Sequence, residues 1–271
     1  MSRIKKTFEV LKASGRKALV TFTMAGDPSI EDSLAVLKSL PEAGADLIEI
    51  GMPFTDPAAD GLTIQHAGQR ALKAGATMKT TLQMVRDFRE GNDHTPIILM
   101  GYANPLYAYG LENFAKDAKK SGVDGLIIVD LPPEEDHELR QFTDALGLDM
   151  IRLVTPTTDE ARLPVILNGA SGFLYYVSIT GVTGTKKADI ATLKPHIDMI
   201  RGKTNLPIAI GFGIRTPNDA QEMSVLGDAV VVGSSIVEKV KDIGENGEGM
   251  ARITDLVCAI SSILGERPDE G

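Results

Sequence analysis

The chain has 271 residues, of which 43% are hydrophobic and 24% are charged, the composition of an ordinary soluble globular protein. Its formal net charge of −9 argues against a nucleic-acid or anionic-membrane surface, because neutralising phosphates requires clustered Lys and Arg. No stretch reaches the roughly 18 apolar residues of a membrane span, and the amino terminus lacks the apolar core of a signal peptide.

Short, β-branched apolar runs recur along the chain, with helical stretches between them. The segment before the first run is amphipathic and predicts an extra N-terminal helix. Most runs are separated by roughly 20 to 30 residues, which predicts right-handed βα units around a parallel sheet. The expected strands are eight: 18–25, 47–52, 97–102, 125–129, 150–154, 173–179, 207–211 and 229–233.

A faint internal repeat favours one closed barrel. The stretches EAGADLIEIG, KSGVDGLIIVD and VLGDAVVVG each run from a helix end through Gly and Asp into a strand. Eight βα units favour an α/β fold of the single (β/α)8 TIM-barrel type over two open α/β halves, which stay the alternative. No linker divides the chain, so we expect one domain over 1–271 with a frayed tail from about 265 to 271.

Glu49 interrupts a strand that is otherwise apolar, between Ile48 and Ile50. A carboxylate buried against the helix layer without a partner would be costly, so we expect Glu49 to face the barrel interior. Barrel enzymes build their active sites at the carboxyl ends of the strands, and partial desolvation there would raise the pKa of this group toward neutrality. The alternative is a structural Glu paired with Lys or Arg from a neighbouring strand.

Asp60 ends the loop MPFTDPAADG, which follows that strand directly. Pro53 and Pro57 restrict the loop, so Asp56 and Asp60 are expected at the pocket rim. Asp-Gly alone is a common turn pair. Beside Glu49, however, Asp60 is a candidate for the second of two carboxylates that divide acid–base and charge-stabilising roles.

Glycine-rich segments follow the last three predicted strands: TGVTGT at 180–185, GFGIRTPNDA at 211–220 and VGSSIVEKV at 232–240. Phosphate-binding barrels commonly use the loops after strands seven and eight together with a helix start, so we predict phosphate binding here, with turn glycines as the alternative. The polar segment 181–195 is typical of a lid. Phe22 and Tyr175 are candidates for lining an aromatic-binding pocket.

Other residues point away from several kinds of chemistry. Cys258 can form no disulfide within the chain, so we expect a reducing cytoplasm, and its apolar neighbours predict a packed side chain rather than a nucleophile. The four histidines show no metal-ligand spacing, and we expect no metal site. None of the eight runs contains Lys, which counts against a Schiff-base aldolase.

Seven motifs together resemble the tryptophan synthase alpha chain family. In chain order they are ALVTFTMAGDPS, AGADLIEIGMPFTDPAADGLTIQ, YANP, SGVDGLIIVDLPPEE, YYVSITGVTGT, GFGI and VVVGSSIV. The resemblance runs from about Thr7 to Leu264. It implies a barrel enzyme of tryptophan biosynthesis, a carbon–carbon lyase that cleaves indole-3-glycerol phosphate to indole and glyceraldehyde 3-phosphate by a retro-aldol reaction, without a cofactor in this chain.

The same resemblance implies roles for individual residues. Glu49 would give a proton to indole C3 and take one from the glycerol hydroxyl, and Asp60 would accept a hydrogen bond from the indole N–H. Tyr175 matches the tyrosine beside the acid–base group. The other implied substrate-binding residues are Phe22, Thr183 and Phe212 in the pocket and Gly184, Gly213, Gly233 and Ser234 at the phosphate.

The family also implies a partner, the tryptophan synthase beta chain, in an alpha-beta-beta-alpha heterotetramer. Pyridoxal phosphate is expected only in that partner, and the expected contacts are the loop 53–60 and YANPL around Asn104. Two positions depart from the family pattern. Ile179 stands where some members carry Arg, and Leu62 replaces a usual proline, which we expect to loosen the Asp60 loop.

Two other functions stay open. Another phosphosugar-binding barrel enzyme, an isomerase or epimerase, is disfavoured by the absence of a metal-ligand set in the sequence and by the aromatic pocket candidates. A ligand-binding regulatory subunit without turnover is disfavoured by the presence of both Glu49 and Asp60.

Overall fold

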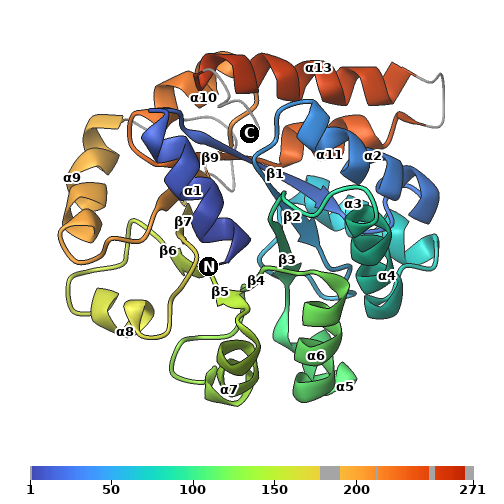
Figure 1. Cartoon of the computed structure of the whole chain (residues 1–271), viewed down its shortest axis with the longest axis horizontal. Helices are drawn as coiled ribbons and strands as arrows, with labels where there is room; N and C mark the ends of the chain where they lie inside the picture. Colours follow the sequence, from blue (N-terminus) through green and yellow to red (C-terminus); the bar gives the residue numbers. More distant parts are fainter. Residues whose placement is uncertain (1, 178–189, 212, 244–247, 266–271) are drawn as a thin grey trace.

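The chain folds into a ring of parallel strands surrounded by helices (Figure 1). The structure is a computed structural model that describes residues 2–177, 190–211, 213–243 and 248–265. The strands are β1 (Ala18–Met24), β2 (Leu47–Gly51), β3 (Ile97–Gly101), β4 (Gly125–Ile128), β5 (Asp149–Met150), β6 (Arg152–Val154), β7 (Leu174–Val177), β8 (Ile208–Gly211) and β9 (Ala229–Val232).

Helices follow most of the strands and cover the outside of the ring (Figure 1). They are α1 (Arg3–Ala13), α2 (Ile30–Glu42), α3 (Leu62–Lys73), α4 (Met78–Arg89), α5 (Ala103–Tyr109), α6 (Leu111–Ser121), α7 (His137–Leu146), α8 (Leu163–Leu167), α9 (Ile190–Arg201), α10 (Pro217–Ser224), α11 (Ser234–Val240) and α13 (Glu248–Ile263).

The sheet closes through one interrupted strand. Its order is β5-β4-β3-β2-β1-β9-β8-β7-β6, and every pairing is parallel. The two ends, β5 and β6, are separated only by Ile151, whose N–H donates to the Leu126 carbonyl at 3.0 Å. The run predicted at 150–154 is therefore two short strands in one position of the barrel. A nearly closed (β/α)8-type barrel is confirmed, and the alternative of two open halves is wrong.

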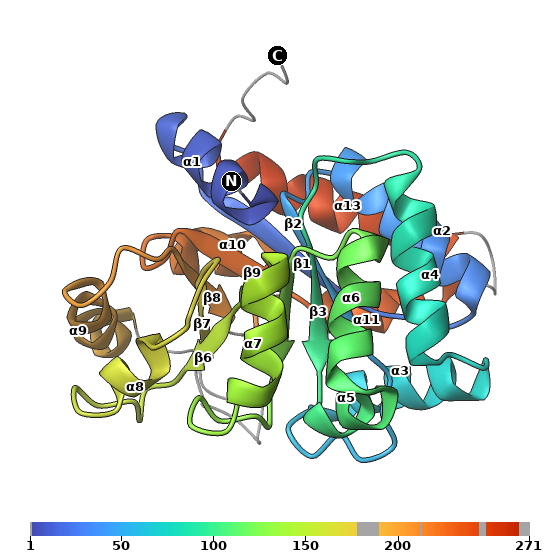
Figure 2. The same cartoon turned by 60° about the horizontal axis from the view of Figure 1, so that its bottom comes forward.

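The extra N-terminal helix closes the amino-terminal end of the barrel. Ile4, Phe8 and Leu11 of α1 pack against inward-facing strand residues such as Leu47 and Ile98. Figure 2 shows α1 at one end of the strands, while β3 points toward the opposite end, where α5 lies. The carboxyl-terminal rim is thus the end that α1 leaves uncovered.

The repeat seen in the sequence has a structural role at the amino-terminal end. Asp46 accepts a hydrogen bond from Leu19 N at 2.8 Å, and Asp124 accepts one from Ile97 N at the same distance. Asp228 accepts one from Ile208 N at 2.9 Å. Each Asp thereby ties the start of its own strand to the strand before it in the chain.

An arginine completes each of these three contacts. Arg16 pairs with Asp46, Arg89 pairs with Asp124 at 2.8 Å, and Arg201 pairs with Asp228 at 3.1 Å. The Arg16–Asp46 pair is buried and the Arg89–Asp124 pair is partly buried, so each charge depends on its partner for stabilisation. Gly and Asp recur before these strands because the amino-terminal end of the barrel is stabilised in the same way each time.

Cys258 is exposed on α13, so the prediction of a packed side chain is wrong. The helix packs through Ile253, Val257 and Ile260, which are buried. One helical step of about 100° separates Cys258 from Val257 and turns it away from the packed face. The apolar run around the cysteine did not distinguish these two faces.

We predict that Asp46→Ala lowers the free energy of unfolding by about 3–5 kcal/mol, because it leaves the Arg16 guanidinium buried without its carboxylate. Denaturant titration measures the change. Glu112→Ala is the matched control, since it removes an exposed partner of Lys116 and should cost about 0.5 kcal/mol or less. Equal effects of the two substitutions would contradict a stabilising role for the buried pair.

Candidate active site

Glu49 lies in the middle of β2 and faces the barrel interior. Ile48 and Ile50 belong to the apolar layer between the strands and the helices, whereas Leu47 belongs to the cluster inside the barrel. Alternate residues of a strand share a face, so Glu49 points inward with Leu47. Phe22 on β1 is its register partner.

The carboxyl group of Glu49 is isolated from water and from charge. Its side chain is 0% exposed, and within the described residues neither Oε1 nor Oε2 has a hydrogen-bond partner. Burial raises the pKa of Glu49 to about 8. The group therefore holds a proton at neutral pH, and its pKa is close enough to neutral pH for the proton to be released readily. The alternative of a structural Glu paired with Lys or Arg finds no support in the described part of the chain.

Tyr175 on β7 is a polar side chain that interacts electrostatically with Glu49. Burial first, and the charge of Glu49 second, raise the pKa of Tyr175 well above its ordinary value, so the hydroxyl keeps its proton. Gly211 on β8 gives this ring its space, because a Cβ there would lie 2.6 Å from the Tyr175 Oη. Tyr175 is thus a neutral donor beside a neutral acid.

Asp60 lies in the loop between β2 and α3, which is held by several hydrogen bonds. Asp60 N donates to Pro57 O at 3.1 Å, and Gln65 Nε2 donates to Asp60 O at 2.8 Å. The Tyr102 hydroxyl accepts from Ala59 N at 3.0 Å and hydrogen-bonds the Asp60 carboxylate. Burial raises the pKa of Asp60, and the bond from Tyr102 opposes that rise.

The helix that follows Asp60 is anchored to the barrel by a bidentate ion pair. Arg70 of α3 donates to both carboxylate oxygens of Asp27, from Nε at 2.7 Å and from Nη2 at 2.8 Å. Asp27 is fully buried in the loop after β1. Because α3 begins two residues after Asp60, this pair limits how far the loop can move away from the strands.

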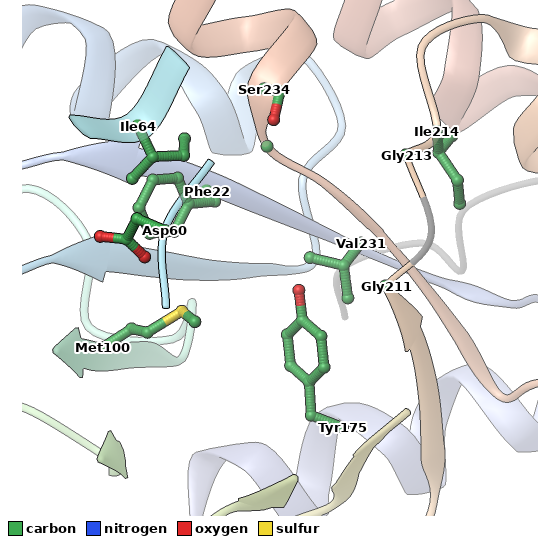
Figure 3. Close-up of a pocket in the computed structure, with 11 residues that line it drawn as sticks. Phe22, Asp60, Ile64, Met100, Tyr175, Gly211, Gly213, Ile214, Val231 and Ser234 are labelled. Atoms are coloured by element: carbon green, nitrogen blue, oxygen red, sulfur yellow. The ribbon is translucent and has the colours of Figure 1, made fainter. Parts of the chain in front are cut away.

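A cavity of about 180 Å3 opens at the carboxyl-terminal rim (Figure 3). Tyr175 extends into it from β7, with Asp60 and Ile64 on the far side and Phe22 beside them (Figure 3). Glu49 is not among the lining residues; it stands in register with Phe22 and interacts electrostatically with Tyr175. The lining residues are Phe22, Asp60, Ile64, Met100, Tyr175, Gly211, Gly213, Ile214, Val231, Gly233 and Ser234.

The loops after β8 and β9 give the cavity backbone groups that are suited to an anion. Gly213 follows β8 with a φ of +51°, and no atom lies within 4 Å of where a Cβ would stand. Gly233 is the N-cap of α11, and the N–H of Ser234 has no acceptor within that helix. Ser235 Oγ donates to Ile214 O at 3.3 Å, which ties the two loops together. Backbone N–H groups arranged in this way bind phosphate oxygens well.

Part of the predicted site lies outside the described residues. Thr183, Gly184, Phe212 and the departure at Ile179 fall there, and the statements about them stay predictions. The predicted lid at 181–195 is only partly described, and residues 190–195 belong to α9. Leu62 is the first residue of α3, a position that favours proline because its N–H would have no partner there. The helix begins at this point without the proline.

Sequence reasoning missed several residues around the cavity. Met100 of β3 and Val231 of β9 each stand one residue before the end of the strand. Ile64 lies in α3 and Ile214 follows β8, and all four line the cavity. Inward alternation along β3 and β9 is a signal that identifies the first two. The contact between Tyr102 and Ala59 spans 43 positions and leaves no local signal in the sequence.

Within the described ranges, His, Cys, Asp and Glu side chains do not gather in threes that could hold a metal ion. Among the helices in these ranges, none combines the length and apolar character needed to cross a bilayer.

The chain is similar to known proteins over almost its whole length. The tryptophan synthase alpha chain family matches residues 8–261. The tryptophan synthase subunit alpha of Legionella pneumophila strain Paris is 37% identical, with 97% of this chain and 98% of that chain covered and a TM-score of 0.91.

Two more solved structures share the fold. A protein from Aquifex aeolicus VF5 is 34% identical, with 98% and 100% of the two chains covered and a TM-score of 0.89. A chain of the aminoacrylate-bound tryptophan synthase from M. tuberculosis is 29% identical, with 98% and 100% covered and a TM-score of 0.87. The chain therefore belongs to the tryptophan synthase alpha chain family and has the alpha-subunit role, an enzymatic one, in tryptophan synthesis.

Proposed function

We propose that the chain cleaves indole-3-glycerol phosphate to indole and glyceraldehyde 3-phosphate, with Glu49 and Asp60 as its catalytic residues. The observation that carries this proposal is the Glu49 carboxyl group, buried without a hydrogen-bond partner among the described residues and with a pKa of about 8. A single group that must both give and take a proton near neutral pH needs such a pKa.

Glu49 supplies its proton to indole C3, which converts the indole ring into an electron-accepting iminium. The bond between C3 and the glycerol carbon then breaks, and its electron pair restores the aromatic ring. The glycerol hydroxyl loses its proton to the Glu49 carboxylate and becomes the aldehyde of glyceraldehyde 3-phosphate. Glu49 ends the cycle protonated, so protons and electrons balance without a redox partner.

Asp60 stabilises the positive charge that develops on the indole nitrogen. Its carboxylate lies at the cavity wall, where it can accept a hydrogen bond from the indole N–H. This role requires the ionised form, and the hydrogen bond from Tyr102 favours that form against burial. Asp60 and Glu49 thus divide two roles between an ionised and a neutral carboxyl group.

The remaining cavity residues bind the two ends of the substrate. Phe22 and Tyr175 contact the indole end, with Thr183 and Phe212 expected beside them. Gly213, Gly233 and Ser234 hold the phosphate through backbone N–H groups, and Gly184 is expected to join them. Support comes from the described members, all of which line one cavity.

The partner in this proposal is the tryptophan synthase beta chain, in an alpha-beta-beta-alpha heterotetramer. Pyridoxal phosphate would serve that chain, since the reaction described above needs only proton transfer here. Exposed apolar side chains on the carboxyl-terminal rim, Leu62 and Tyr107, support a docking surface there. We further propose a single domain over 1–271 and a cytoplasmic location.

The alternatives are less well supported. An isomerase or epimerase acting on a phosphosugar would not require a cavity wall of Phe22, Ile64, Met100 and Val231. A regulatory subunit without turnover would gain nothing from Glu49, because a buried, unpaired carboxyl group destabilises the fold when it ionises. An assay of indole release from indole-3-glycerol phosphate separates all three functions.

We predict that the wild-type chain releases indole from indole-3-glycerol phosphate and does so faster with the beta chain. Glu49→Gln should fold and bind substrate but lower kcat by roughly 10²- to 10⁴-fold, because the amide cannot exchange a proton. Indole absorbance gives the rate, and substrate binding to the variant is measured by calorimetry. Substantial indole release by Glu49→Gln would rule out the proton-transfer role.

We predict that Glu49→Gln stabilises the protein at high pH. The pKa of Glu49 is about 8 when folded and 4.5 as a free side chain, so wild-type stability is fully present below about 4.5 and falls until about pH 8. Above pH 8 the variant should unfold at a higher denaturant concentration than the wild type. Its free energy of unfolding should be higher by up to about 5 kcal/mol, with little difference at pH 4.5. Glu112→Gln, at an exposed residue, should show no such trend.

We predict that kcat/KM falls as the pH rises through about 8, because Glu49 loses the proton that it must give to C3. The same fall in kcat/KM at high pH should appear in Tyr175→Phe, since the pKa of Tyr175 lies well above its ordinary value. Steady-state rates between pH 6 and 10 test both statements. A flat profile in the wild type or in Tyr175→Phe would contradict the assignment to Glu49.

A further inference from the structure

The loops after three neighbouring strands are held to one another by side-chain hydrogen bonds. Asp60 follows β2, Tyr102 follows β3 and Asp130 follows β4. These strands run parallel and adjacent, so their loops meet at the same rim, where Figure 2 shows α5. Neither Tyr102 nor Asp130 lines the cavity that contains Asp60.

Tyr102 makes the first link. Its hydroxyl accepts a hydrogen bond from Ala59 N at 3.0 Å and bonds the Asp60 carboxylate, so it fixes two consecutive residues of the loop. The ring is 5% exposed and lies 5.4 Å from the Phe54 ring, centroid to centroid. Burial, with the charges of Asp60 and Asp130 adding to it, raises the pKa of Tyr102 to about 12. The hydroxyl therefore keeps the proton that it donates to Asp60.

Asp130 makes the second link. Its Oδ1 accepts a hydrogen bond from Ala103 N at 2.8 Å. Ala103 is the first residue of α5, and the first N–H of a helix has no acceptor inside the helix and favours a negative charge. Val129 N donates to Gly101 O at 2.9 Å on the other side of Tyr102. The backbone on both sides of Tyr102 is thereby fixed to the loop after β4.

We propose that Asp130 is a positioning residue for Asp60 and that it acts through Tyr102. The inference rests on the proposed function only in taking Asp60 as the acceptor of the indole N–H. Asp130 fixes the peptide between Tyr102 and α5, and this places the Tyr102 hydroxyl where it meets Ala59 and Asp60 together. Without Asp130 the hydroxyl loses its fixed place, and Asp60 loses the donor that opposes its protonation.

Kinetics of four variants test the inference in the full chain. Asp130→Ala should lower kcat about twofold to fivefold, with KM little changed, since Asp60 acts on charge that develops in the transition state. Asp130→Asn keeps an accepting oxygen and should stay within about twofold of wild type. Tyr102→Phe should lower kcat roughly tenfold. The matched control is Asp117→Ala, which removes the bond from the Tyr109 hydroxyl at the other end of α5 and should leave kcat unchanged.

A double variant separates positioning from general weakening of the fold. If Asp130 acts through Tyr102, then Tyr102→Phe/Asp130→Ala is no slower than Tyr102→Phe alone, because the link is already broken. Multiplied losses would overturn the inference. The acid limb of the kcat profile should also move to higher pH in Asp130→Ala and not in Asp117→Ala, since Asp60 ionises less readily without its donor.

Hydrogen exchange decides the inference without turnover. The Ala59 N–H should exchange faster in Asp130→Ala than in wild type, although Asp130 does not touch Ala59, and Asp117→Ala should leave it unchanged. Unchanged exchange at Ala59 in Asp130→Ala overturns the inference, whatever the indole assay shows. A wild-type chain that releases no indole would overturn the proposed lyase function alone.

Discussion

The chemistry of the site depends on one carboxyl group that the barrel holds out of water. Glu49 is fully buried with a pKa of about 8, so the fold is most stable when this group is neutral. The strand fixes the direction of the Glu49 side chain, and its carboxyl group has no hydrogen-bond partner among the described residues. The surrounding residues keep this isolation: Phe22 lies in register with Glu49, and Tyr175 stays neutral beside it. The proposed proton transfer in both directions depends on that constraint.

The barrel holds its buried carboxyl groups in two ways. At the amino-terminal end, Asp46 and Asp124 receive backbone N–H groups and arginine partners, and they link adjacent strands. In the middle of β2, Glu49 receives neither among the described residues. A paired carboxylate stabilises the fold but has no proton to give. Asp27 at the carboxyl-terminal rim is buried and paired with Arg70, so the lack of a partner distinguishes Glu49 from these carboxyl groups at either end of the barrel.

Patterns that depend on local alternation could be predicted from the sequence, and features that depend on distant contacts could not. The apolar runs gave all strand positions, and the isolated Glu49 gave its inward direction, because both follow from the two-residue period of a strand. The break at Ile151 arises from pairing with β4 on one side and β7 on the other. The exposure of Cys258 depends on which face of α13 packs. The hold of Tyr102 on the Asp60 loop depends on two loops that meet only in the folded chain.

The two candidate catalytic groups differ in how firmly the fold holds them. Glu49 belongs to a strand paired on both sides, so its position changes only if the sheet changes. Asp60 belongs to a loop whose place depends on Tyr102, Gln65 and the anchoring of α3 by Arg70. If Tyr102 holds Asp60 as proposed, a partner that contacted α5 would act on Asp60 through Tyr102 and leave Glu49 in place. Such a contact would change the stabilisation of charge on the indole ring without altering the group that moves the proton.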